Sequence, residues 1–249
     1  QLGMEQSYNS VLALLKTAHL ENPLLDFGCI ALSSNEANPI ETLLNEAINY
    51  DFGLVYLKLA KNKRIAQIFE PIPLTGFSKK KNLIKDKVFL VTGGMGGLGL
   101  LVAKRLLEKE CRGLILTGRS PSNHSLQSKL LQLYGDNKQV KYVAADISKR
   151  HDVIELHSFC NRNFGQVDGI IHCAGLNKDS YLIKKELADF RQTLAPKITG
   201  VLNLDWVWKD DNLQWFVLFS SSAASLGNAG QGDYSAVNGF LNDFAILRN

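Results

Sequence analysis

Short apolar runs alternate with longer amphipathic segments along the chain from residue 88 onward. The runs are rich in Val and Ile, and the intervening segments repeat apolar residues at helical spacing. This alternation predicts βαβ units on a parallel sheet. The predicted strands cover residues 88–94, 113–118, 140–146, 167–175 and 215–221, and helices fill the intervals, the first from Gly97 to Lys109.

Strands joined by crossovers of this length predict an α/β fold with a Rossmann-like, doubly wound parallel sheet. In such a sheet, ligands bind in the crevice at the carboxyl ends of the strands. We therefore expect residues with a chemical role to follow the strands directly.

The chain before residue 79 has a different pattern. Residues 39–49 have helical periodicity, residues 53–70 alternate as a hairpin around a polar KNK turn, and no glycine-rich turn of the phosphate-binding kind occurs. Two prolines and a glycine between residues 71 and 78 indicate a boundary. We predict a smaller structural subdomain with its linker over residues 1–78, which does not bind cofactor, and a catalytic subdomain over residues 79–249.

Composition narrows the function classes. The chain has 249 residues, of which 45% are hydrophobic and 21% charged, with a net charge of +4 and four cysteines without a CxxC pair. We expect a reduced, cytoplasmic globular protein with no metal site, no membrane span and no nucleic-acid partner. The basic cluster at residues 79–87 is interpreted as a solvated linker or, alternatively, a docking surface for an acidic partner.

The stretch TGGMGGLG follows the first predicted strand and opens a helix. Glycines at these positions let the backbone turn sharply and approach a pyrophosphate, which then meets free N–H groups at the helix start. The motif contains GxGxxG as Gly94, Gly96 and Gly99. We assign cofactor contacts here to Thr92, Gly93, Gly94, Gly96, Gly97, Leu98 and Gly99.

Three further strand ends carry candidate cofactor residues. Arg119 and Ser120 occupy the position at which an NAD-dependent enzyme has an acidic residue that binds the adenosine ribose. A cation here favours the 2′-phosphate of NADPH instead. Alternatively, Arg119 is an ordinary surface residue. Asp146, with Ile147 after it, is placed to accept from the adenine amino group, or else belongs to a strand-end turn. Cys173, Ala174 and Gly175 form a small-residue rim along which the cofactor could lie, and the cofactor contacts are assigned to Ala174 and Gly175.

The stretch GDYSAVNGF places Tyr234 one helical turn before Asn238, where a tyrosine-dependent reductase usually has a lysine. A phenol is a poor proton donor at neutral pH unless a cation lies close by and favours the phenolate. Ser221, at the carboxyl end of the last predicted strand, can hydrogen-bond a substrate carbonyl. Lys197, in the helix-like stretch 190–208, is the candidate for the missing cation.

The spacing of these motifs resembles the ketoreductase domains of modular polyketide synthases, a branch of the short-chain dehydrogenase/reductase superfamily. The resemblance rests on TGGMGGLG, LTGRS, AADIS, IIHCAG, LAPKITGVLNL and FVLFSSSAASLGNAGQGDYSAVNGFLNDF. It implies a catalytic tetrad of Lys197, Ser221, Tyr234 and Asn238, with Lys197 and Tyr234 also near the cofactor. It further implies NADPH-dependent reduction of a β-keto group on a phosphopantetheine-linked thioester, with an acyl carrier protein and other synthase domains as partners.

The resemblance also implies a product configuration and the nature of the first subdomain. One family class has a Leu-Asp-Asp triplet where this chain has Asn177, Lys178 and Asp179, and another has a tryptophan where this chain has Leu226. The retained Asp179 and the absent tryptophan favour a D-configured (B-type) hydroxyl. The altered triplet is similar to that of synthases whose acyltransferase acts in trans. The first subdomain is expected to be a degenerate Rossmann-like unit.

Two alternatives remain open from the sequence. The family continues past the tyrosine-bearing helix with a strand, a lid helix and a final strand, so we expect that a C-terminal part is missing here. A catalytically silent scaffold domain is therefore one alternative. A stand-alone short-chain reductase or a sugar-nucleotide epimerase is the other, although the epimerase requires a YxxxK pair that Asn238 does not supply.

Overall fold

The computed structural model describes residues 8–32, 38–49, 56–60, 63–66, 69–71, 82–135 and 139–248. The predicted boundary at residues 71–78, the KNK turn and the start of the basic cluster fall wholly or partly outside these residues. The division of the chain between residues 78 and 79 therefore stays a prediction.

The larger sheet has five strands, all parallel, in the order β6-β5-β4-β7-β8. They are β4 (Val88–Thr92), β5 (Gly113–Gly118), β6 (Val140–Ala144), β7 (Gly169–His172) and β8 (Trp215–Leu218). The order reverses between β4 and β7, which is the switch point at which such sheets bind ligands. The predicted Rossmann-like parallel sheet is confirmed. Four of the predicted strands end earlier than expected, because their last residues turn into the loops at the carboxyl edge.

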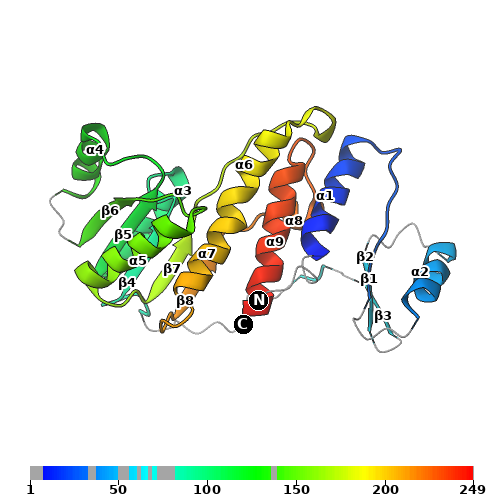
Figure 1. Ribbon diagram of the computed structural model, residues 1–249, viewed down its shortest axis with the longest axis horizontal. Coiled ribbons are helices and arrows are strands. Elements are labelled where there is room, and N and C mark those ends of the chain that lie inside the picture. Colours follow the sequence, from blue (N-terminus) through cyan, green and yellow to red (C-terminus); the bar gives the residue numbers. More distant parts are fainter. Residues whose placement is uncertain are drawn as a thin grey trace.

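Helices cover both faces of this sheet (Figure 1). They are α3 (Gly97–Glu108), α4 (His124–Tyr134), α5 (Arg150–Phe164), α6 (Leu187–Lys197), α7 (Thr199–Val207), the short α8 (Ala223–Leu226) and α9 (Gly232–Arg248). The stretch 190–208, expected as one helix-like segment, forms two helices that meet at Ile198.

Alternate residues of the central strand β4 point to opposite faces and build two cores. Val88 and Leu90 pack with residues of α5 and α7, whereas Phe89 and Val91 pack with residues of α3. Every residue of β4 is buried, as expected for a strand covered on both faces.

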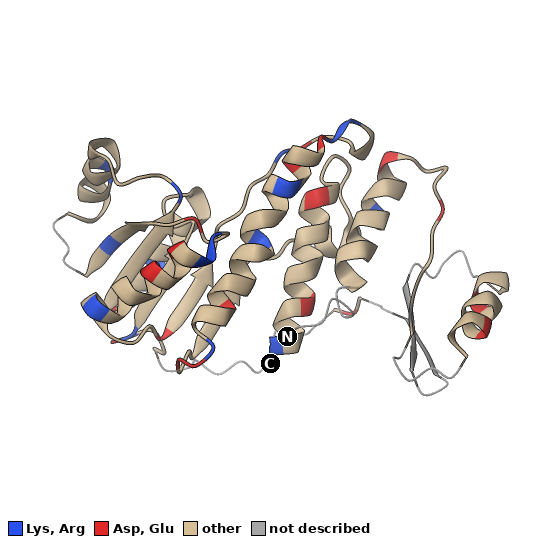
Figure 2. Ribbon diagram, viewed as in Figure 1, with Lys and Arg blue, Asp and Glu red and all other residues tan. Residues whose placement is uncertain are grey.

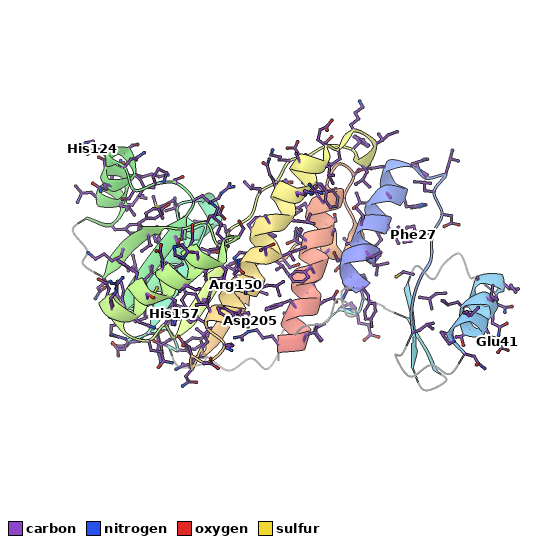
Figure 3. All side chains as sticks on the ribbon, viewed as in Figure 1. Phe27, Glu41, His124, Arg150, His157 and Asp205 are labelled. Atoms are coloured by element: carbon purple, nitrogen blue, oxygen red, sulfur yellow. The ribbon has the colours of Figure 1, made fainter. Side chains whose placement is uncertain are left out.

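The contact between α5 and α7 includes aromatic side chains, near the labelled Arg150, His157 and Asp205 (Figure 3). The Arg150 guanidinium lies 4.6 Å from the Trp206 ring centroid, and the His157 ring meets buried Trp208 edge-on at 4.8 Å. These contacts fix α7, which directly follows the segment that carries Lys197.

The described residues before residue 79 form two helices and a separate small sheet. Helix α1 (Tyr8–Glu21) packs on α9 and α8, while β1 (Cys29–Leu32), β2 (Tyr56–Ala60) and β3 (Lys63–Ala66) form a three-stranded sheet beside α2 (Pro39–Ile48) (Figure 1). Strands β2 and β3 pair antiparallel, which agrees with the predicted hairpin.

Helix α1 lies very close to α9. A Cβ on Gly239 would lie 2.3 Å from the backbone oxygen of Asn9, so only glycine fits there. Asn9 also donates its backbone N–H to Asp243 over 3.0 Å, and the buried hydroxyl of Thr17 bonds to Ser235 over 3.1 Å. The first helix of the chain is therefore part of the packing around the tyrosine-bearing helix.

Charged residues of both signs are spread over the helices (Figure 2). None of the helices within the described ranges is long and apolar enough to cross a membrane. The described part of the chain also contains no group of three or more His, Cys, Asp or Glu residues able to hold a metal ion.

We expect Gly239→Ala to lower the free energy of unfolding by about 1–3 kcal/mol, as overpacking of a close contact does. The added methyl group forces α1 away from α9. Ile246→Ala, at a position of α9 that is 71% exposed, is the control and should change stability by less than about 0.5 kcal/mol. Urea unfolding of both variants measures the difference, and equal effects would contradict the close packing.

Candidate active site

A groove of about 530 Å³ opens at the carboxyl ends of β4, β5, β6 and β7. Its volume lies within the usual range for a small-molecule or cofactor site. Nine of the residues predicted to contact a cofactor line it: Thr92, Gly93, Gly96, Arg119, Ser120, Asp146, Ile147, Ala174 and Gly175.

The other predicted glycine-motif residues, Gly94, Gly97, Leu98 and Gly99, lie in the turn and at the start of α3. Gly93 makes the turn, with a φ of +63° that only glycine adopts freely. A Cβ on Gly99 would lie 2.3 Å from the oxygen of Gly93, so Gly99 lets α3 approach the strand. A Cβ on Gly97 would meet no atom within 4 Å. The open side of this turn is therefore where a pyrophosphate has room to approach.

The buried hydroxyl of Thr117, which lines the groove, has no hydrogen-bond partner in the described structure. A buried polar atom without a partner is costly, unless a ligand satisfies it. Together with the open glycine turn, this fits a dinucleotide in the groove.

Arg119 is exposed at the end of β5, and its guanidinium makes no ion pair or hydrogen bond within the described residues. The loop around it is held by Tyr142, whose hydroxyl lies 2.7 Å from the carbonyl oxygen of Ser120 and 3.1 Å from that of Gly118. Tyr142 carries no signal for this role in the sequence. The arrangement presents a free cation at the rim of the groove.

Asp146 lies in the groove but also makes a local turn. Its Oδ1 atom accepts from the backbone N–H of Ser148 over 3.1 Å and from the Ser148 hydroxyl over 2.7 Å. The strand-end turn considered from the sequence is therefore formed, and any contact to a ligand has to coexist with it.

His172, at the end of β7, is a buried structural residue. Its Nδ1 atom lies 2.8 Å from the Thr92 hydroxyl, which also accepts from the backbone N–H of Ala174 over 3.3 Å. Burial, with a smaller contribution from Lys197, lowers the pKa of His172 to about 3, so the ring is neutral. These bonds join the ends of β4 and β7 under the small-residue rim.

Lys197, the last residue of α6, reaches the tyrosine-bearing helix. Its Nζ atom donates to Oδ1 of Asn238 and to the carbonyl oxygen of Phe219, both over 2.8 Å. It lies 5.5 Å from the ring centroid of Tyr234. Asn238 in turn donates from Nδ2 to the backbone oxygen of Tyr234 over 2.8 Å. The structure thus brings together three members of the predicted tetrad.

The surroundings of Lys197 depend on two residues that carried no clear signal for this role. The Phe219 carbonyl follows β8 and accepts from the ammonium. A Cβ on Gly175 would lie 2.9 Å from Cε of Lys197, so the rim glycine leaves room for the lysine chain.

Burial lowers the pKa of Lys197 to about 8, an effect that Cys173 partly offsets. Lys197 as a whole is only 6% exposed, so its charge is little screened by solvent. It therefore acts strongly on the groups around it below pH 8.

Ser221, the fourth member, lies in the loop after β8, because that strand ends at Leu218. Its Oγ atom accepts from the backbone N–H of Ala223 over 3.2 Å. No hydrogen bond among the described residues joins it to Lys197, Tyr234 or Asn238. Its hydroxyl proton is not used by that contact, so Ser221 can still donate to a ligand.

The two residues assigned to stereocontrol lie in different settings. Asp179 accepts from Nε2 of Gln231 over 3.0 Å, just before the tyrosine-bearing helix. Leu226, at the end of α8, is 62% exposed.

We expect the free energy of unfolding to rise with pH between about 8 and 10 because of Lys197. In this range the unfolded lysine keeps its proton while the folded one has lost it, so the unfolded state binds more protons and stability increases with pH. Urea unfolding at several pH values measures the trend. Lys197→Met is the reference, because it has no ionisable group at this position. As the pH rises, the free energy of unfolding of wild type should increase relative to that of the variant. A difference that stays constant with pH would contradict the lowered pKa of Lys197.

Comparison with known proteins gives consistent matches. The family model described as "KR domain" matches residues 87–249. Polyketide synthases PksN and PksL of Bacillus subtilis (strain 168) are each 35% identical to the chain over 250 residues. The matches cover 99% and 100% of the chain but only 4% and 6% of those relatives.

Two solved structures resemble the chain over almost its whole length. A ketoreductase domain from the bacillaene assembly line has a TM-score of 0.84 at 32% identity, covering 98% of this chain and 58% of that one. An N-terminal ketoreductase from the macrolactin assembly line has a TM-score of 0.81 at 35% identity, covering 97% and 49%. The chain thus spans about half the length of these solved structures.

Proposed function

The chain belongs to the KR domain family, the ketoreductase domains of polyketide synthases, and we propose that it reduces the β-keto group of a carrier-bound polyketide thioester with NADPH. The observation that carries this proposal is the buried contact of Lys197 with Asn238 beside the ring of Tyr234. In this contact, a lysine from a distant segment supplies the cation that a tyrosine needs in order to act as a proton donor.

Tyr234 is the proton donor in this reaction. NADPH, when held in the groove, would supply the hydride for the carbonyl carbon. Tyr234 would give its phenolic proton to the carbonyl oxygen, so that the ketone becomes a secondary alcohol. The Lys197 ammonium favours the negative charge left on the phenol oxygen. Ser221 donates a hydrogen bond to the carbonyl oxygen and stabilises the charge that develops there.

Asn238 holds the lysine rather than acting on the substrate. It accepts from Nζ of Lys197 and donates to the backbone oxygen of Tyr234, so one side chain fixes the distance between acid and cation. The buried setting keeps water away from this contact and strengthens its electrostatic effect.

The groove supports NADPH as the cofactor. The glycine turn would hold the pyrophosphate at the start of α3, and the free guanidinium of Arg119 would pair with the 2′-phosphate. Lys197, which lies against Gly175 of the rim, would also be near the cofactor ribose.

The same proposal includes the partners and the product. The substrate would arrive on the phosphopantetheine arm of an acyl carrier protein, next to other domains of the synthase. Asp179, placed beside the start of the tyrosine-bearing helix, supports the D-configured (B-type) product.

We expect Tyr234→Phe to lower kcat by at least about 100-fold, the usual contribution of a positioned general acid. The phenyl ring keeps the packing, so the Kd for NADPH should stay unchanged. The assay is NADPH oxidation with a short β-ketoacyl thioester, with Tyr134→Phe on α4 as the control. Undiminished turnover by the Tyr234 variant would refute the assignment.

We expect Arg119→Ala to weaken NADPH binding by about ten- to one hundred-fold, which matches the roughly 1.5–3 kcal/mol of a hydrogen bond to a charged group. NADH lacks the 2′-phosphate, so its affinity should not change. Fluorescence titration with both cofactors measures this, and Arg105→Ala at the far end of α3 controls for lost positive charge. Equal weakening for both cofactors would argue against a 2′-phosphate site, and no binding of either cofactor by wild type would favour a scaffold domain.

A further inference from the structure

Lys185 and Asp233 form an ion pair inside the protein, directly before the proposed proton donor. Nζ of Lys185 lies 2.8 Å from Oδ2 of Asp233, and the two side chains are 3% and 0% exposed. Asp233 immediately precedes Tyr234 in the first turn of α9. The function proposed above assigns no task to either charge.

Each partner makes a second contact that extends the pair. The other carboxylate oxygen of Asp233 accepts from the backbone N–H of Tyr234 over 2.9 Å. A carboxylate at this place also interacts favourably with the positive end of the helix dipole. The Lys185 ammonium additionally donates to the carbonyl oxygen of Lys178. The pair therefore joins the start of α9 to both ends of residues 178–185, referred to below as the 178–185 segment.

The 178–185 segment contacts residues 230–232, which lead into α9, at several points along its length. Asp179 accepts from the Gln231 side chain, and Ser180 donates its backbone N–H to Gly230 over 2.8 Å. Leu182 packs against Gly232, where a Cβ would lie 2.4 Å from Cδ2 of the leucine. The segment that holds the proposed stereocontrol residue is thus linked at several points to the start of the tyrosine-bearing helix.

The end of α1 supports this attachment from outside. The Glu21 carboxylate accepts from the backbone N–H of Gly230 over 2.9 Å and from that of Leu182 over 2.6 Å. The Glu21 side chain therefore links the 178–185 segment to the residues before α9, which the buried ion pair also joins.

Burial makes this pair different from the surface ion pairs of the protein. The Lys85 and Glu110 side chains, for example, are 54% and 67% exposed, where an ion pair contributes little. Two buried charges lose their hydration, and a well-packed apolar pair of the same volume is often at least as stable. Removing one partner alone, in contrast, leaves an unpaired buried charge and is strongly destabilising. The pair is thus better explained by the single arrangement that it specifies than by net stabilisation.

We propose that Lys185 and Asp233 are positioning residues that fix Tyr234 against the 178–185 segment and thereby set which face of the ketone is presented for reduction. This inference rests on the proposed function and extends it to specificity. The two residues do not touch the reacting atoms; they act through the backbone of Tyr234 and through the segment that carries Asp179.

The test uses Lys185→Met, Asp233→Asn and the double variant in the complete ketoreductase. Asparagine keeps the acceptor for the Tyr234 backbone N–H and removes only the charge. Lys184→Met, at the exposed neighbouring position, is the matched control. The readouts are Tm, kcat, the NADPH Kd and the ratio of the two hydroxy enantiomers.

We expect both single variants to lose stability and the double variant to regain most of it, because no unpaired charge stays buried. We expect the double variant to keep a kcat lowered about tenfold and a product ratio shifted toward the minor enantiomer. NADPH affinity should not change, because neither residue lines the groove. A double variant that regains the wild-type kcat and product ratio together with its Tm would overturn the proposal, since the pair would then be purely structural.

A readout independent of turnover separates this inference from the proposed function. Fluorotyrosine at position 234 reports the environment of that ring by fluorine NMR. We expect the resonance to shift or broaden in the double variant and to stay unchanged in Lys184→Met. If wild type reduces no β-ketoacyl thioester, the proposed function is wrong, but the spectrum still tests whether the pair positions Tyr234. If the double variant has the wild-type spectrum, the pair does not position Tyr234.

Discussion

The hydrogen bond from the Lys197 ammonium to Asn238 is the contact on which the site depends. It places a cation from the end of α6 against α9, and the same ammonium is held by the Phe219 carbonyl after β8. Burying the charge is unfavourable, as the pKa of about 8 for Lys197 indicates. The fold therefore has to supply acceptors and space for this side chain, and the rim glycine Gly175 provides the space.

The proposed site around Tyr234 draws on two parts of the molecule. The carboxyl ends of the sheet strands form the groove in which the glycine turn, Thr117 and Arg119 suit a dinucleotide. The 178–185 segment is joined to the start of α9 by the buried pair of Lys185 and Asp233. Tyr234 is thus held in place by its surroundings, and a precise proton transfer needs such support.

Ten of the 17 residues of helix α9 are buried, and this explains why the first helix of the chain matters to the site. The α9 face away from the sheet packs on α1, at a distance that requires Gly239. The Asp243 carboxylate, whose pKa is raised mainly by burial, accepts from Asn9, and Glu21 holds the loops before α9. Residues far apart in the chain therefore share the task of holding one helix.

Local sequence patterns were sufficient for the sheet, the hairpin strands and the glycine turn, because each depends on the spacing of residues that are neighbours in the chain. The resemblance to a known family added the tetrad as a prediction, and the structure places Lys197, Asn238 and Tyr234 close together. Other features lay beyond the sequence: the break at Ile198, the docking of α1 and the pairing of Lys185 with Asp233. These depend on which surfaces meet when distant segments pack, and on how much room and how many polar partners each burial leaves. Such contacts have no periodic signature in the chain, so only the tertiary structure decided them.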